Sequence, residues 1–76
     1  MDENEFYVVY GEVEKGTMIK VTWSVPAEMS GVGKEVLFSD QGVFEGIENG
    51  AVFIRRSDGT LKPYLMSSIR NVEVIS

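Results

Sequence analysis

The stretch GIENGAVFIRRSDGTLKPYLMSSIRNVEVIS, from Gly46 to Ser76, decides the fold that this sequence predicts. It contains two dipeptides, Asn49-Gly50 and Asp58-Gly59, that accept the positive φ angles of a two-residue β-turn. Each dipeptide lies between runs of β-branched and aromatic residues, which are typical of strands. The sequence therefore predicts two tight hairpins and a terminal strand over residues 72–75, arranged as a compact β-meander.

Two-residue turns fix which side chains share a face of the sheet. The first turn predicts three opposite pairs: Ile47 with Val52, Gly46 with Phe53, and Phe44 with Arg55. The second predicts three more: Ile54 with Pro63, Phe53 with Tyr64, and Arg55 with Lys62. One face then carries a core set, Ile47, Val52, Ile54, Leu61, Pro63 and Leu65. The opposite face combines aromatic rings with cations and consists of Phe44, Phe53, Arg55, Lys62 and Tyr64.

Further strands are predicted upstream of the first turn. Residues 17–23 alternate, which places Ile19, Val21 and Trp23 on the core side. Residues 5–10 are aromatic and β-branched and also predict a strand. Residues 35–38 and 43–48 fit one strongly bent strand with a bulge at Gly42.

Two segments are predicted to lie outside the strands. Residues 24–34 are rich in Gly and Pro and form the longest loop, with room for one helical turn at residues 27–29. Residues 67–69 predict a 3₁₀ turn before the last strand. Pro63 has no N–H to donate, so the strand over residues 60–66 is expected to have an unpaired side there or to border an edge. The fold class is all-β: a small, strongly bent five-stranded antiparallel barrel with little helix.

The composition narrows the class of protein. Seventy-six residues make a single domain, residues 1–76, and a chain this short buries only about 60% of its unfolded surface. There is no cysteine and no histidine, so no disulfide framework, cofactor or metal site is expected, and no enzymatic reaction. Neither a signal peptide nor a membrane-spanning run is evident, so we expect a cytoplasmic protein with no membrane partner.

Charge is distributed unevenly along the chain. The net charge is −5, and the acidic segment of residues 1–14 holds five acids and no base. The remaining residues hold seven bases and seven acids. From Asn49 to Val72 there are four bases against Asp58 alone. A local basic patch on an acidic protein is therefore predicted over the C-terminal meander.

One motif resembles a known family. The segment Ile69-Arg70-Asn71, followed by Val72, Val74 and Ile75, is similar to the second motif of the Sm/LSm-like proteins, which build bent five-stranded barrels, assemble as rings and bind RNA. The resemblance implies that Arg70 stacks on or clamps a base and that Asn71 shapes the adjoining turn in the left-handed conformation. Only Asn49 stands where the first motif of that family places a base-contacting amide. An Sm-like or SH3-like barrel is the corresponding fold.

The leading hypothesis is a non-enzymatic Sm-like protein that forms a closed homo-oligomeric ring. We expect the ring to bind single-stranded nucleic acid, with RNA as the expected ligand, and to have a role in RNA or DNA processing. Its candidate binding residues are Arg70, Asn71, Asn49, Arg55, Lys62, Tyr64 and Phe53. The alternative is a structural or assembly module, as in a phage or multiprotein complex, that binds protein through its aromatic face and sheet edges. Each residue also has a plainer interpretation: the aromatic rings pack against a neighbouring strand or subunit, and Arg70 pairs with Glu73 or another surface carboxylate.

Overall fold

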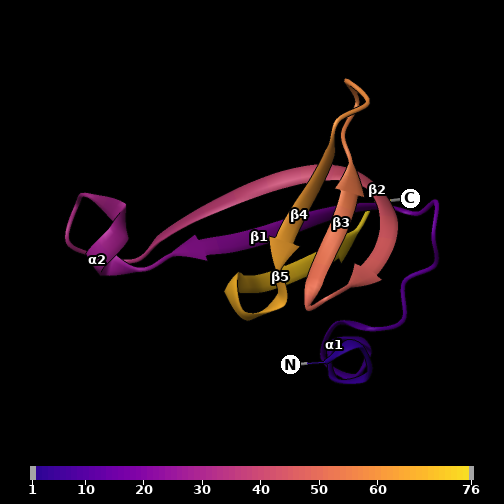
Figure 1. The fold of residues 1–76 in the computed structure, drawn as a ribbon, viewed down its shortest axis with the longest axis horizontal. Helices are drawn as coiled ribbons and strands as arrows, with labels where there is room; N and C mark the ends of the chain where they lie inside the picture. The colour runs from indigo at the N-terminus through magenta and orange to yellow at the C-terminus, as the bar shows by residue number, and fades with distance from the viewer. Residues whose placement is uncertain (1, 76) are drawn as a thin grey trace.

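The computed structural model describes residues 2–75 and contains five strands, two α-helices and one 3₁₀ helix (Figure 1). In chain order the elements are α1 (Glu3–Tyr10), β1 (Met18–Val25), α2 (Ala27–Ser30), β2 (Val36–Glu48), β3 (Ala51–Arg55), β4 (Leu61–Leu65), η1 (Met66–Ser68) and β5 (Ile69–Val74). The strands form one antiparallel sheet in the order β4-β3-β2-β1-β5. The prediction of five antiparallel strands is confirmed. The sheet is bent but not closed over residues 2–75, because β4 and β5 are its two edges.

The N-terminal segment is a helix, so the strand predicted over residues 5–10 is wrong. Asp2 caps α1 by accepting a hydrogen bond from the Glu5 N–H at 2.8 Å, which satisfies one of the free donors of the first turn. Phe6 is fully buried in the core, and Tyr10 packs against it with ring centroids 5.0 Å apart. This spacing of four residues places both rings on one helix face. Burial of Phe6 in the core therefore outweighs the β propensity of the segment.

Strand β2 is a single bent strand of 13 residues, as the sequence predicted, but its bulge is not at Gly42. The register with β3 shifts between Phe44 and Gly46, so Glu45 is the extra residue. Gly42 has a different role. A Cβ at Gly42 would lie 2.7 Å from the carbonyl oxygen of Arg55, so the absence of a side chain lets β2 and the end of β3 approach closely.

The two hairpin turns differ from each other. At Asn49-Gly50 both residues have positive φ, 52° and 77°, and Glu48 pairs with Ala51, which confirms a two-residue turn. The second turn has three residues, 57–59. The Arg56 N–H donates to the Thr60 carbonyl, and Gly59 has a φ of 87°. Asp58 makes this turn longer than predicted, because its carboxylate accepts hydrogen bonds from the backbone and side chain of Thr60.

The extra turn residue moves the β3–β4 register by one position. Phe53 lies opposite Pro63 and Val52 lies opposite Tyr64, where the sequence predicted Phe53 opposite Tyr64. The bulge at Glu45 similarly places Ile54, not Arg55, opposite Phe44. A shift of one residue exchanges the two faces of a strand. In β4 the exposed residues are therefore Leu61, Lys62, Pro63 and Leu65, of which three were predicted to be core.

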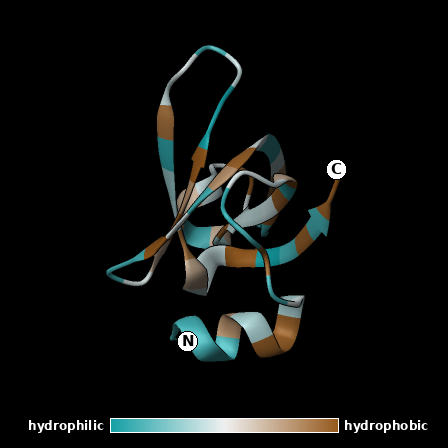
Figure 2. Cartoon of the chain, turned by 90° about the vertical axis from the view of Figure 1, so that its right-hand side faces the viewer, coloured by the Kyte–Doolittle hydropathy of each residue, from teal (hydrophilic) through white to brown (hydrophobic). Residues whose placement is uncertain are grey.

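The core lies between the concave face of the sheet and α1. Its fully buried members are Phe6, Ile19, Val21, Phe44, Val52 and Ile54. Apolar and polar residues alternate along the strands, as expected for a sheet with one covered face (Figure 2). The sequence predicted Ile19, Val21, Val52 and Ile54 correctly, whereas Trp23 and Ile47 are only partly buried. Phe44 was predicted on the opposite face and lies in the core instead.

Strands β1 and β2 extend beyond their neighbours as a two-stranded arm. Pairing with β5 ends at Trp23, and pairing with β3 ends at Val43, whereas β1 and β2 remain paired to Val25 and Val36. The predicted helical turn is present at the tip of the arm as α2, and it projects away from the rest of the sheet (Figure 1). The arm forms because β1 and β2 are longer than their neighbours, and no local sequence pattern predicted it.

The last strand begins earlier than predicted. The 3₁₀ turn is η1, residues 66–68, and β5 continues directly from it at Ile69. The register of β5 with β1 shifts between Thr22 and Trp23, so Arg70 lies in a bulge. Asn71 pairs with Thr22 inside the strand and is not among the residues with positive φ, so the left-handed turn expected at Asn71 is not formed.

Candidate functional site

The cationic-aromatic face predicted from the sequence is divided between the two faces of the sheet. Phe53 and Arg55 lie on the outer face, opposite Pro63 and Leu61. Tyr64 and Lys62 lie on the inner face, opposite Val52 and Ile54. Because the two groups point in opposite directions, they cannot act as one surface for a ligand.

Each arginine of the described chain is held by a carboxylate. The Nε atoms of Arg55, Arg56 and Arg70 lie 2.9, 3.5 and 3.3 Å from carboxylate oxygens of Glu45, Asp40 and Glu35, respectively. The three arginine side chains are 40–49% exposed, so these ion pairs contribute little to stability. They do, however, reduce the positive charge available to a phosphate.

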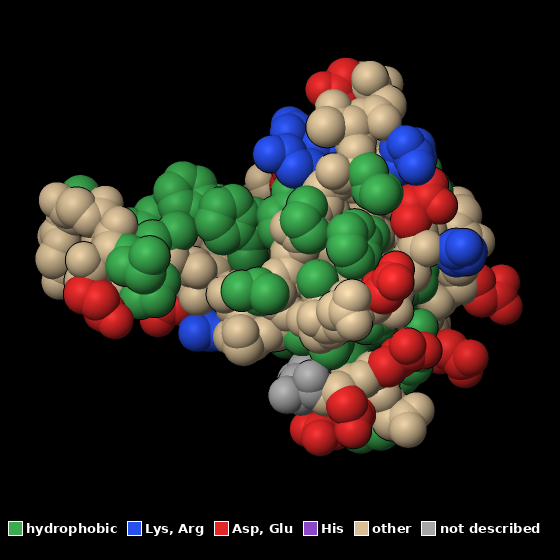
Figure 3. Space-filling view, in the orientation of Figure 1, with side chains coloured by type: hydrophobic (Ala, Val, Ile, Leu, Met, Phe, Trp, Pro, Cys, Tyr) green, Lys and Arg blue, Asp and Glu red, His purple; other side chains and the backbone are tan. Residues whose placement is uncertain are grey.

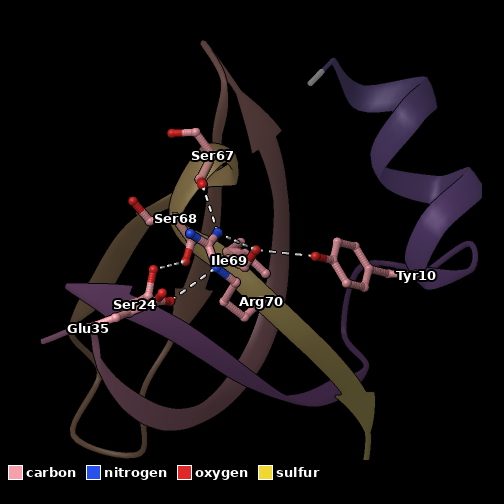
Figure 4. Close-up of polar contacts among 7 residues, drawn as sticks. All are labelled: Tyr10, Ser24, Glu35, Ser67, Ser68, Ile69 and Arg70. Atoms are coloured by element: carbon pink, nitrogen blue, oxygen red, sulfur yellow. Dashed lines mark hydrogen bonds and ion pairs between the residues drawn. The ribbon is translucent and has the colours of Figure 1, made fainter. Parts of the chain in front are cut away.

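Arg70 is oriented by contacts within its own region (Figure 4). Its Nη1 donates to the carbonyls of Ser67 at 3.1 Å and Ile69 at 3.4 Å, while its Nε faces Glu35. The plainer interpretation of Arg70, a pair with Glu73 or another surface carboxylate, is therefore confirmed, and the partner is Glu35. Glu35 precedes β2 and was not identifiable as its partner from local spacing.

The two asparagines lie in different settings. Asn49 is exposed in its turn, and the next residue, Gly50, accepts a backbone hydrogen bond from Met66 at 3.0 Å. This bond brings the Asn49 turn beside η1, the same segment whose Ser67 carbonyl holds Arg70. Asn71 is exposed within β5. The structure thus brings Asn49 and Arg70 to one segment and leaves Asn71 in a strand.

An aromatic hollow of about 770 Å³ opens between the arm and β4. Its apolar lining is Trp23, Val25, Pro26, Met29, Pro63, Tyr64 and Leu65, and its polar lining includes Asp40, Arg56 and Lys62. Trp23 stacks on Phe38 with ring centroids 5.0 Å apart and meets Tyr64 at 5.8 Å. Hereafter this hollow, lined by these ten residues, is the aromatic groove. It lies within a green apolar area that extends from the arm to the middle of the molecule (Figure 3).

The polar side of the aromatic groove is organised around Asp40. Its carboxylate accepts a hydrogen bond from the Tyr64 hydroxyl at 2.5 Å and lies 3.5 Å from Arg56. Burial, followed by the hydrogen bond and the charge of Asp40, raises the pKa of Tyr64 to about 12. Lys62 forms no ion pair within residues 2–75, so it is the cation of the groove that remains available to a ligand.

Trp23 is the member of the groove that sequence reasoning placed in the core. It is half-buried, and its Nε1 is buried without a hydrogen-bond partner in the described chain. Strand alternation correctly assigned Trp23 to the inner face. Alternation could not show that the sheet narrows to two strands, β1 and β2, at Trp23 and leaves the indole ring partly uncovered.

A second hollow of about 490 Å³ lies between α1 and the β2–β3 hairpin. Its lining includes Glu3, Tyr7, Lys15, Glu48 and Phe53. Burial, together with the charges of Glu3 and Glu12, raises the pKa of the Tyr7 phenol. The predicted residue Phe53 therefore lines this second hollow and not the aromatic groove, which contains Tyr64.

No family model, curated protein or solved structure matches this chain. None of the helices within residues 2–75 is long and apolar enough to span a bilayer. The fold and the groove define the molecule as a small, open, mainly β domain with an uncovered aromatic surface.

Proposed function

We propose that this chain is a non-enzymatic assembly module that associates head to tail with further copies of itself through the free edges of β4 and β5. The observation that carries this proposal is the open sheet, whose two edge strands display large apolar side chains. Leu61 and Leu65 of β4 are 43% and 61% exposed, and Val74 of β5 is 55% exposed. A free edge is a template for a further strand, and a small domain gains stability by covering it.

The direction of the backbone N–H and carbonyl groups along β4 and β5 supports pairing of each edge with another strand. The Ile75 N–H donates to Met18, so the N–H and carbonyl of Val74 point away from β1 toward the free side. Backbone hydrogen bonds join Arg56 to Thr60 at one end of the β3–β4 pair and Met66 to Gly50 at the other. Hydrogen-bonded and non-hydrogen-bonded pairs alternate between these ends, so Pro63 falls in a non-hydrogen-bonded pair and its nitrogen faces the free side of β4. Pro63 therefore removes no bond from the β3–β4 ladder. It also limits strand addition, which favours a specific partner over indiscriminate edge pairing.

A β4 edge that meets a β5 edge uses two different surfaces, so the interface is heterologous and closes into a ring when the rotation between subunits divides a full turn. This ring is the assembly that the Sm-like resemblance implies. Light scattering or sedimentation velocity should show a discrete oligomer of the full chain at tens of micromolar. A monodisperse monomer, or open fibres, would contradict the ring.

A proline at the free edge provides a direct test. Val74→Pro removes an N–H that faces away from β1, so it should dissociate the oligomer while the folded subunit keeps its far-UV circular dichroism spectrum. The matched control is Val74→Ala, which removes the same exposed side chain but retains the N–H, and it should remain assembled. Equal behaviour of the two variants would show that the backbone edge is not the contact.

Binding of single-stranded nucleic acid is the second candidate function, and the aromatic groove favours it. Trp23 and Tyr64 supply faces on which bases can stack, and Lys62 lies beside them. On the Sm-like interpretation, Arg70 adds a cation near η1. Arg70→Ala should weaken oligoribonucleotide binding by about 1–3 kcal/mol per site without dissociating the oligomer, and Arg70→Lys should restore only part of the loss.

The ion pair of Arg70 provides a matched control for that measurement. Glu35→Gln removes the competing carboxylate and should strengthen binding if the guanidinium contacts the nucleic acid. Affinity should also fall steeply as salt rises, by counterion release. Fluorescence anisotropy with a labelled oligouridylate at several salt concentrations measures both effects. If no binding is found even at low salt, the function is assembly alone.

A further inference from the structure

We infer that the aromatic groove of one copy binds the outer face of helix α1 of the next copy. This inference rests on the proposed head-to-tail assembly and assigns a second contact to the same interface. The ligand of the groove is then a segment of this same protein, supplied by another copy.

The outer face of α1 is unusually apolar for an acidic helix. Phe6 anchors the inner face in the core, whereas Val8 and Val9 are 85% and 59% exposed. Glu5 lies on the same exposed side, one helical turn before them. Adjacent apolar residues flanked by carboxylates are suited to an apolar groove with a cationic rim.

Charge complementarity favours this pairing. Residues 2–14 hold five carboxylates and no base. The groove carries Arg56, which is paired with Asp40, and Lys62, which has no ion-pair partner within residues 2–75, so its surplus charge is positive. Acidic side chains gather at the end of the molecule where α1 lies. At the opposite end cationic side chains flank the β3–β4 hairpin, whose tip carries one acidic side chain (Figure 3). Unlike charges at opposite ends orient copies head to tail.

Each partner surface is continuous with one of the proposed edges. The groove is lined by Lys62, Pro63, Tyr64 and Leu65, which are four of the five residues of β4. Helix α1 is fixed to β5 by the Tyr10 hydroxyl, which donates to the Ile69 carbonyl at 3.2 Å (Figure 4). A β4 edge that meets the β5 edge of the next copy therefore also brings the groove toward that copy's α1.

The helix that occupies the groove must come from another copy. Phe6 is fully buried in its own core, and Tyr10 is bonded to its own β5, so α1 cannot reach the groove of the same chain without unfolding that contact. The size of α1 also agrees with the size of the groove. Eight helical residues span about 12 Å, and a groove of about 770 Å³ is large enough to receive the side chains of one such face.

A mixing experiment tests the contact with two surface variants. The helix variant, Val8→Lys/Val9→Lys, places cations on the outer face of α1. The groove variant, Met29→Glu/Lys62→Glu, makes the groove acidic; Met29 is 75% exposed, and Lys62 is also exposed. Each variant alone should self-associate about tenfold or more weakly than the parent chain. Mixed together, the two variants should associate more strongly than either variant alone, because the intact helix of one fits the intact groove of the other.

Matched controls use the loop at the tip of the arm. Val32 is 63% exposed, and Lys34 is exposed nearby, and neither residue lines the groove. Val32→Lys and Lys34→Glu should associate as the parent chain does. They repeat the same kinds of substitution at a similar exposure, so they separate a specific contact from a general effect of charge.

The outcomes separate this inference from the proposed function. If the parent chain is monomeric, both are overturned. If the parent associates and the helix and groove variants associate equally well, the edge-mediated assembly stands and the α1 contact is overturned. If the groove variant loses oligouridylate binding but keeps its self-association, the groove is a nucleic-acid site and the inference is likewise overturned.

Discussion

At the scale of single residues, Asp40 links the polar contacts of the aromatic groove. It lies opposite Val21 on the inner face, where it accepts the Tyr64 hydroxyl and pairs with Arg56. A carboxylate in this position holds the Tyr64 hydroxyl, and the Tyr64 ring lies beside Trp23 with ring centroids 5.8 Å apart. Neither partner was predictable from the strand that contains Asp40, because the three residues come from three separate segments of the chain.

The pKa of Tyr64 gives a prediction for pH dependence. Its value in the folded chain is about 12 against 10.0 for an unperturbed tyrosine, so the neutral phenol is favoured by folding. This contribution to stability is present in full below pH 10 and is lost as pH rises from 10 toward 12, because the unfolded chain releases its proton first. The free energy of unfolding should therefore fall over that interval, and less so in Tyr64→Phe.

Asp40→Asn tests the cause of that shift. Burial raises the pKa of Tyr64 most, and the hydrogen bond and charge of Asp40 raise it further. Removing the charge should lower the Tyr64 pKa only part of the way to 10.0. Tyrosinate absorbance during a pH titration measures this change, with Tyr64→Phe identifying the transition among the three tyrosines. An unchanged titration in Asp40→Asn would show that the hydrogen bond is absent in solution.

At the scale of the elements, the turn between β3 and β4 determines which residues form the groove. Three turn residues place Tyr64 opposite Val52, whereas two would place it opposite Phe53 on the outer face. The sequence Asp58-Gly59 is compatible with both lengths. The bonds from Thr60 to Asp58, which also lower the pKa of the Asp58 carboxyl, favour the longer turn.

Gly59 provides the test of this turn. Its φ of 87° lies in a region that L-residues rarely adopt, and a Cβ there would meet open space, so strain arises from the backbone alone. Gly59→Ala should lower the free energy of unfolding by about 1–2 kcal/mol. Gly59→Asn should lower it less, because asparagine tolerates positive φ. Denaturant unfolding of both variants measures the difference, and an alanine variant as stable as the parent would exclude this turn geometry.

At the scale of the whole molecule, the distribution of apolar surface favours association. A chain of 76 residues buries a core of modest size, while Phe38, Leu65 and Met29 are 47%, 61% and 75% exposed around the groove. Large exposed apolar patches are rare on monomeric proteins, and where they occur they often mark interaction sites. Both free edges and the aromatic groove would be covered in a head-to-tail assembly.

Association predicts a thermal stability that depends on concentration. Partners that bind only the folded chain stabilise it, by up to about 2.7 kcal/mol when their concentration is roughly a hundred times the dissociation constant. The Tm of the parent chain should therefore rise with protein concentration. In Val74→Pro it should be independent of concentration. Thermal unfolding monitored by circular dichroism over a wide range of concentrations measures both, and a constant Tm in the parent would argue for a monomer.

The sequence alone determined the elements whose signals are local. Asn49-Gly50 fixed the first turn and the pairing of Ile47 with Val52, because few residues accept the required φ angles. Alternation identified Ile19 and Val21 as core, since a strand with one covered face requires it. Pro63 correctly indicated an edge strand. These conclusions needed no knowledge of distant contacts.

Only the tertiary structure decided the remainder. Residues 5–10 have the composition of a strand and form a helix because Phe6 is buried against a sheet that comes later in the chain. The bulge at Glu45 and the third residue of the β3–β4 turn each move a register by one residue, which exchanges the faces of the sheet. The aromatic groove therefore consists of residues from separate strands and the arm, and no local pattern in the sequence could bring them together.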